Sequence, residues 1–155
     1  LPICEGARLT ELTLLRLDPI GIPPYSARGI TQTLELIDAA SQMGRTVNGT
    51  LIDLSEPAFR KYRSTITCTD QQQPALDGVW PGQVLTVHCA AELSYLTSGG
   101  SPARPLASTT DDPATRTEGS FSFYRPRLTM MVVSYRTDFD EWGASVNWQL
   151  LLEEQ

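Results

Sequence analysis

Residues 128–152 read LTMMVVSYRTDFDEWGASVNWQLLL, and this stretch decides the fold because it contains two strongly patterned segments. The second segment, 145–152, places apolar side chains at every second position: Val146, Trp148, Leu150 and Leu152. That period predicts a β-strand with one buried face. The first segment, 128–135, is apolar on both faces, which is typical of a central strand. A turn expected at 138–143 would join the two strands into a hairpin.

The same period recurs nearer the N-terminus. In segment 62–69, alternate residues share one face: Tyr62, Ser64, Ile66 and Cys68. Segment 83–93 directs Leu85, Val87 and Cys89 inward, and 121–124 predicts another short strand. The pair Asn48-Gly49 predicts a turn or bulge inside 45–54. Segment 30–43 fits either a strand or an amphipathic helix, and the pattern does not separate the two.

These segments predict one domain over residues 1–155, mainly β, folded as an antiparallel β-sandwich or open barrel. Two segments break the pattern. Residues 1–29 predict an extended N-terminal arm, because prolines fix the backbone and remove hydrogen-bond donors. Residues 97–119, rich in Ser, Thr, Gly and Pro, predict a long exposed loop that buries too little surface to order itself.

Charge and hydropathy narrow the function classes. The 155 residues include 18 acidic and 12 basic side chains, for a net charge of −6. Nucleic-acid binders concentrate positive charge, whereas the densest basic cluster here is only Arg60, Lys61 and Arg63. No apolar run approaches the roughly 20 residues of a membrane helix. We therefore expect neither direct nucleic-acid binding nor membrane association.

The residues that could carry catalysis or metal binding are few. The single histidine, His88, precedes Cys89 in a predicted strand, so the two side chains should point to opposite faces and not form a catalytic pair. Cys4, Cys68 and Cys89 lack the paired spacing of zinc ligands. We expect buried free thiols, although a disulfide between Cys68 and Cys89 is an alternative if their strands are adjacent. Exposed carboxylates lack the shifted pKa of general acids. We therefore expect no enzyme activity, no cofactor and no metal.

Several segments, read in order, carry a family resemblance. They are TQTL at 31–34, RTVNG at 45–49, FRKYRSTI at 59–66, LDG at 76–78 and VLTVHC at 84–89. Their order resembles small β-rich structural proteins of tailed bacteriophages, over roughly residues 31–90 and more loosely in the terminal hairpin. The resemblance implies a non-enzymatic virion subunit, assembled in the host cytoplasm. Its partners would be copies of itself and phage capsid or tail proteins, with a capsid-decorating role slightly favoured over a neck or tail role.

Apolar side chains in the N-terminal arm are the candidate partner contacts. These residues are Ile3, Ile20, Ile22, Pro23, Pro24 and Tyr25. Isoleucines are unexpected in a merely mobile tail, so we expect the arm to grip neighbouring subunits. Two other classes compete with the virion subunit: a secreted or periplasmic β-sandwich binding module, and an enzyme that completes its site across a subunit interface.

Overall fold

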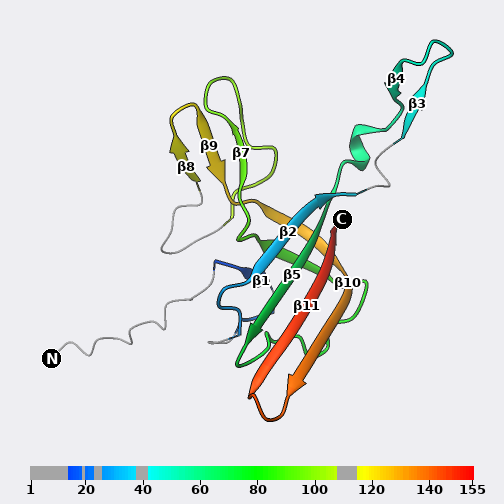
Figure 1. Ribbon diagram of the computed structural model, residues 1–155. Coiled ribbons are helices and arrows are strands. Elements are labelled where there is room, and N and C mark those ends of the chain that lie inside the picture. Colours follow the sequence, from blue (N-terminus) through cyan, green and yellow to red (C-terminus); the bar gives the residue numbers. More distant parts are fainter. Residues whose placement is uncertain (1–13, 19, 23–25, 38–41, 108–114) are drawn as a thin grey trace.

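A computed structural model describes residues 14–18, 20–22, 26–37, 42–107 and 115–155. Its centre is a six-stranded antiparallel sheet in the order β1-β6-β10-β11-β5-β2, which curls strongly into a half-barrel (Figure 1). The strands are β1 (Arg16–Asp18), β2 (Thr31–Leu36), β5 (Tyr62–Asp70), β6 (Val84–His88), β10 (Arg127–Asp140) and β11 (Ser145–Glu154). The expected fold class, mainly β and folded as an antiparallel β-sandwich or open barrel, is confirmed.

The inner face of the half-barrel holds the core. Strand β11 buries the four side chains that its alternation predicts, and Trp148 is only 1% exposed. Residues Ile66 and Cys68 of β5 and Leu85 and Val87 of β6 join the same cluster. Strand β10 pairs with β11 on one side and β6 on the other, so it is central as expected. Its pairing with β11 is the predicted hairpin.

The chain before β2 covers this core. Leu15 and Leu17 are buried, and β1 pairs with β6 at the sheet edge. Farther along, the carbonyl oxygen of Ser26 accepts a hydrogen bond from Trp148 Nε1 at 2.8 Å. Within segment 30–43, residues Thr31–Leu36 form a strand paired with β5, which decides between the strand and helix alternatives for that part.

Two smaller sheets lie beyond the half-barrel. Strands β3 (Met43–Arg45) and β4 (Leu51–Asp53) form a hairpin, followed by one 3₁₀ turn, η2 (Pro57–Phe59). Strands β7 (Leu93–Leu96), β8 (Thr115–Glu118) and β9 (Phe121–Tyr124) form a three-stranded sheet in the order β7-β9-β8. No helix among the described residues is long and apolar enough to cross a membrane.

Three expected boundaries need correction. The loop predicted at 97–119 is wrong at Thr115–Glu118, which form a strand paired with β9. All four residues of this strand are exposed, so no alternation of apolar side chains indicates it in the sequence. Residues 108–114 of that loop lie outside the described residues. The turn predicted at 138–143 starts later, because β10 continues to Asp140. The strand predicted at 83–93 ends at His88, because residues 89–92 are not part of a strand and β7 begins only at Leu93.

Candidate interaction surfaces

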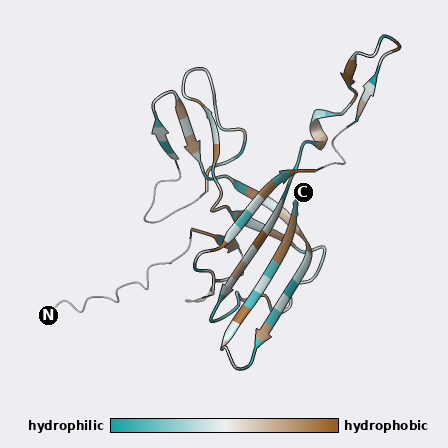
Figure 2. Cartoon of the chain, in the orientation of Figure 1, coloured by the Kyte–Doolittle hydropathy of each residue, from teal (hydrophilic) through white to brown (hydrophobic). Residues whose placement is uncertain are grey.

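The hairpin of residues 42–54 stands away from the half-barrel, and we call it the projecting hairpin (Figure 1). None of its residues is buried. Its apolar side chains are nevertheless large, with Met43 65%, Leu51 53% and Leu54 63% exposed. Figure 2 shows hydrophobic colouring on β4 of this hairpin, beyond the sheet. An exposed cluster of this kind is a candidate interaction surface.

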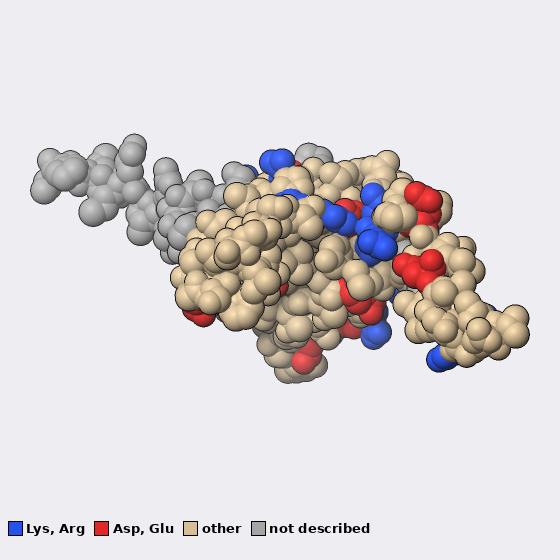
Figure 3. All heavy atoms as spheres, turned by 90° about the horizontal axis from the view of Figure 1, so that it is seen from above, with Lys and Arg blue, Asp and Glu red and all other residues tan. Residues whose placement is uncertain are grey.

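Charged groups are sparse on this surface. The space-filling view from above shows the projecting lobe at the right with few charged side chains (Figure 3). Arg45 lies next to the turn, and its Nη1 donates a hydrogen bond to the backbone oxygen of Gly49 at 2.9 Å. No ion pair joins Arg45 to an acidic group in the described part of the chain. The hairpin therefore offers an apolar surface with one available positive charge.

The tip of the projecting hairpin is held by its own hydrogen bonds. The backbone N–H of Thr46 donates to the oxygen of Thr50 at 2.9 Å, and that of Gly49 donates to Thr46 at 2.8 Å. Gly49 takes φ +82°, a conformation that glycine adopts without strain. The turn presents Val47 fully to solvent. A tip fixed in this way loses little conformational entropy on binding.

The base of the projecting hairpin is anchored to the half-barrel. The backbone N–H of Ile37 donates to the oxygen of Lys61, which continues the ladder between β2 and β5. Arg104 donates from Nη2 to the oxygen of Arg60 at 3.0 Å and from Nε to Glu154 at 2.8 Å. These contacts fix the point from which the hairpin projects.

A hollow of about 730 Å³ lies beside the C-terminal half of β10. A β-bulge between Val132 and Ser134 shifts the register of β10 against β11. Because a bulge re-aims the side chains that follow it, Tyr135 and Thr137 turn toward the inner face and line the hollow. Tyr135 is half-buried and donates from its hydroxyl to Gln73 Oε1 at 2.7 Å.

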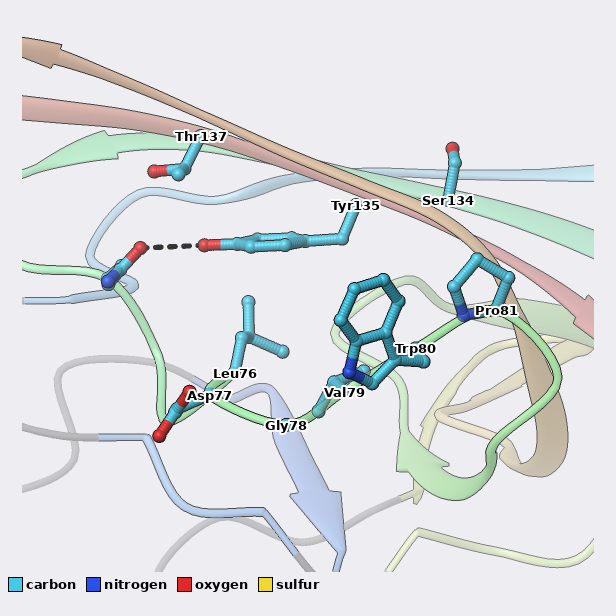
Figure 4. Close-up of a pocket in the computed structure, with 10 residues that line it drawn as sticks. Leu76, Asp77, Gly78, Val79, Trp80, Pro81, Ser134, Tyr135 and Thr137 are labelled. Carbon is cyan, nitrogen blue, oxygen red and sulfur yellow. Dashed lines mark hydrogen bonds between the residues drawn. The ribbon is translucent and has the colours of Figure 1, made fainter.

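The opposite wall of the hollow is the loop between β5 and β6 (Figure 4). Two tight turns shape it, with Gly78 at φ +79° and Gly82 at φ +99°, and the second follows Pro81 as type II turns prefer. Leu76 and Val79 supply apolar wall, and Trp80 is largely exposed at the opening. The Oγ1 of Thr137 is buried without a hydrogen-bond partner. Such an orphan hydroxyl costs free energy until a partner satisfies it.

Within the described part of the chain, the residues considered for catalysis do not form an accessible centre. His88 is buried, and its Nε2 shares a hydrogen bond of 3.0 Å with Asp18 Oδ2 on the neighbouring strand β1. A general base must reach its substrate, which a buried imidazole held by a structural partner does not do. Within the described ranges, no three His, Cys, Asp or Glu side chains gather closely enough to hold a metal.

The two described cysteines are buried free thiols. Cys68 lies on β5 and Cys89 follows β6, and two strands separate these in the sheet, so the condition for a disulfide is not met. Burial raises the pKa of the Cys89 thiol to about 12 and also raises that of Cys68. Both therefore carry a proton at neutral pH and are poor nucleophiles. Cys4 lies outside the described residues.

Of the predicted partner contacts, the structure describes only Ile20 and Ile22. Both are half-buried and pack against the core of their own chain. Ile3, Pro23, Pro24 and Tyr25 lie outside the described residues, so a grip by the N-terminal arm stays a prediction.

Comparison with known proteins adds no assignment. No family model, no curated protein and no solved structure matches this chain.

The sequence alone does not indicate the projecting hairpin or the hollow beside β10 as a binding site. The projecting hairpin reads as an ordinary strand pair, because Leu51 and Leu54 are the same residue types that fill a core. A clue was available in Arg45-Thr46-Val47-Asn48-Gly49, which places an aliphatic residue within a tight turn, where solvent exposure is the rule.

Proposed function

We propose that this chain is a non-enzymatic structural subunit of a tailed-phage virion. It works through contacts with copies of itself and with capsid or tail proteins. The observation that carries the proposal is the projecting hairpin, whose apolar side chains contribute nothing to the core of their own chain. A lone two-stranded hairpin is marginally stable in water, and its apolar surface favours covering by another subunit.

The chemistry of the described residues supports the same class of protein. The histidine is buried against Asp18, and the two thiols are buried and protonated. A subunit that acts by contact requires none of the accessible acids, bases or nucleophiles that an enzyme requires. The virion setting comes from the resemblance of residues 31–90 to small phage structural proteins.

A second candidate function has one observation in its favour. The hollow beside Tyr135 combines apolar walls, an exposed Trp80 and the polar groups of Tyr135 and Gln73, which is the usual make-up of a ligand site. This favours the binding-module alternative. Screening a panel of soluble sugars and other metabolites by thermal shift separates the candidates, since a virion subunit should gain stability from none of them.

The direct test of the proposed function is location. Antibodies raised against the purified chain should label particles from the phage that encodes it, at the head surface, neck or tail, in electron micrographs. Antibodies adsorbed with the purified chain serve as the control and should not label. Particles that carry no label, and whose protein content by mass spectrometry lacks the chain, would refute the virion role.

A further inference from the structure

We propose that the projecting hairpin of one copy docks into the hollow beside Tyr135 of a second copy. This inference rests on the proposed function, because it names the partner and the two surfaces of the assembly contact. The contact is head-to-tail: each copy gives its hairpin to one neighbour and its hollow to another. Such an interface propagates until it closes into a ring or extends as a filament.

The positions of the two surfaces suit a head-to-tail contact. Residues 55–61 join the projecting hairpin to the first residue of β5, and the loop that walls the hollow begins after the last residue of β5. Strand β5 is nine residues long, which at about 3.3 Å a residue separates the two surfaces by roughly 30 Å. The hairpin of a chain therefore does not fill the hollow of the same chain, and a second copy must supply it.

The apolar parts of the two surfaces correspond. The hairpin tip offers Val47, fully exposed on a fixed turn. The hollow offers aliphatic wall from Leu76 and Val79, and Trp80 at its opening. A volume of about 730 Å³ lies within the roughly 300–1,000 Å³ of binding pockets, so several side chains of a hairpin tip can enter.

The polar groups correspond as well. Arg45 near the tip has no acidic partner among the described residues, and Asp77 on the rim of the hollow has no basic one. Joining the copies pairs this positive charge with this negative charge, which favours a second copy over an unrelated apolar partner.

The test is reversal of the charge pair. Sedimentation velocity of the full chain, from roughly 1 μM to 1 mM at low salt, should show concentration-dependent oligomers. Arg45→Asp and Asp77→Arg should each weaken association about tenfold or more, and the double variant should recover most of it. Glu141→Arg makes the same change of charge outside both surfaces and should leave association unchanged.

Mixing single-surface variants tests the head-to-tail geometry. Leu51→Asp disables the hairpin and Trp80→Ala disables the hollow, so neither variant should form oligomers alone. Mixed together, they should form a one-to-one dimer, because one copy keeps a hairpin and the other keeps a hollow. Leu96→Asp and Trp142→Ala alter comparably exposed residues on other surfaces and should still assemble.

The outcomes separate this inference from the proposed function. Chains that remain monomeric at all concentrations, or that oligomerise equally with Trp80→Ala, overturn the docking. Absence of rescue in the charge-reversed double variant also overturns it. None of these results affects the labelling of particles, which alone decides the virion role.

Discussion

The side-chain oxygen of Gln32 accepts a hydrogen bond from the backbone N–H of Ala90 at 2.7 Å and a second one from Ala91 at 3.1 Å. Gln32 lies on β2, one edge of the six-stranded sheet, whereas Ala90 follows β6, and three strands lie between them in the sheet. The curl of the half-barrel brings the two segments together, and this amide ties them.

Replacing Gln32 by Leu should therefore destabilise the chain. The substitution leaves two backbone donors without their acceptor, which costs about 1–3 kcal/mol for each group that stays buried. Urea denaturation followed by tryptophan fluorescence measures the change. Thr33→Ala, at the exposed neighbouring position, should stay within about 0.5 kcal/mol. Equal stabilities for the two variants would mean that water replaces Gln32 and that the tie is not structural.

Trp148 should be the costliest single side chain to truncate. It is 1% exposed, lies on the face of β11 that points into the half-barrel, and donates a hydrogen bond to the backbone oxygen of Ser26. Trp148→Ala should lower the free energy of unfolding by about 3–5 kcal/mol. Trp148→Phe keeps most of the packing and loses the hydrogen bond, so its loss should be smaller. A loss below about 1 kcal/mol for the alanine variant would contradict the assigned strand face.

The buried thiols should resist modification in the folded chain. Burial raises the pKa of Cys89 to about 12, so almost no thiolate exists at pH 8. In a Cys4→Ser background, Ellman's reagent should react slowly with the native protein. In guanidinium chloride it should react at once with both Cys68 and Cys89. Rapid release of the chromophore by the native protein would show that one of these thiols is accessible.

Acid should weaken the chain partly through Asp70. Hydrogen bonds from the Arg28 side chain hold the pKa of the Asp70 carboxyl below its ordinary value of 3.8. The unfolded state therefore binds this proton at a higher pH than the folded state. The stabilisation is complete above the ordinary pKa and is lost as the pH falls through the lowered one.

Comparing urea denaturation at pH 6 and at about pH 3 measures this linkage. Asp70→Asn should be less stable than the parent at pH 6, and the difference should shrink toward pH 3. Glu56→Gln, at an exposed position, controls for the loss of one carboxylate. A difference that does not depend on pH would show that Asp70 acts only through its shape and neutral hydrogen bonds.

How far the sequence predicts this fold depends on whether a segment has one buried face. Trp148 and Leu150 alternate with polar residues, so strand β11 and its inward face could be read directly. In Thr115–Glu118 every residue is exposed, so neither face carries a hydrophobic signal. The bulge in β10 is hidden for the opposite reason, because both Val132 and Val133 are apolar and the shift of phase leaves no trace. The sequence therefore does not predict that Tyr135 turns toward the hollow.

The interaction surfaces escape prediction for a different reason. Burial is a property of the assembled layers, and a residue type alone does not say whether a layer covers it. Leu51 and Leu54 are residue types of a core strand but are exposed, with no described element of the chain covering them. Arg45 and Asp77 are separated along the sequence and in space, so their correspondence emerges only when two copies are considered.

The exposed leucines of the projecting hairpin should contribute little to the stability of the folded monomer. The double substitution Leu51→Ser, Leu54→Ser should change the free energy of unfolding by no more than about 0.5 kcal/mol, because both side chains are already exposed. By contrast, Leu150→Ala, at a fully buried position on β11, should cost about 2–5 kcal/mol. Urea denaturation at a concentration where the chain is monomeric measures both. A large loss from the hairpin substitutions would mean that the hairpin already packs against its own chain, and its apolar surface would then not be free to bind another copy.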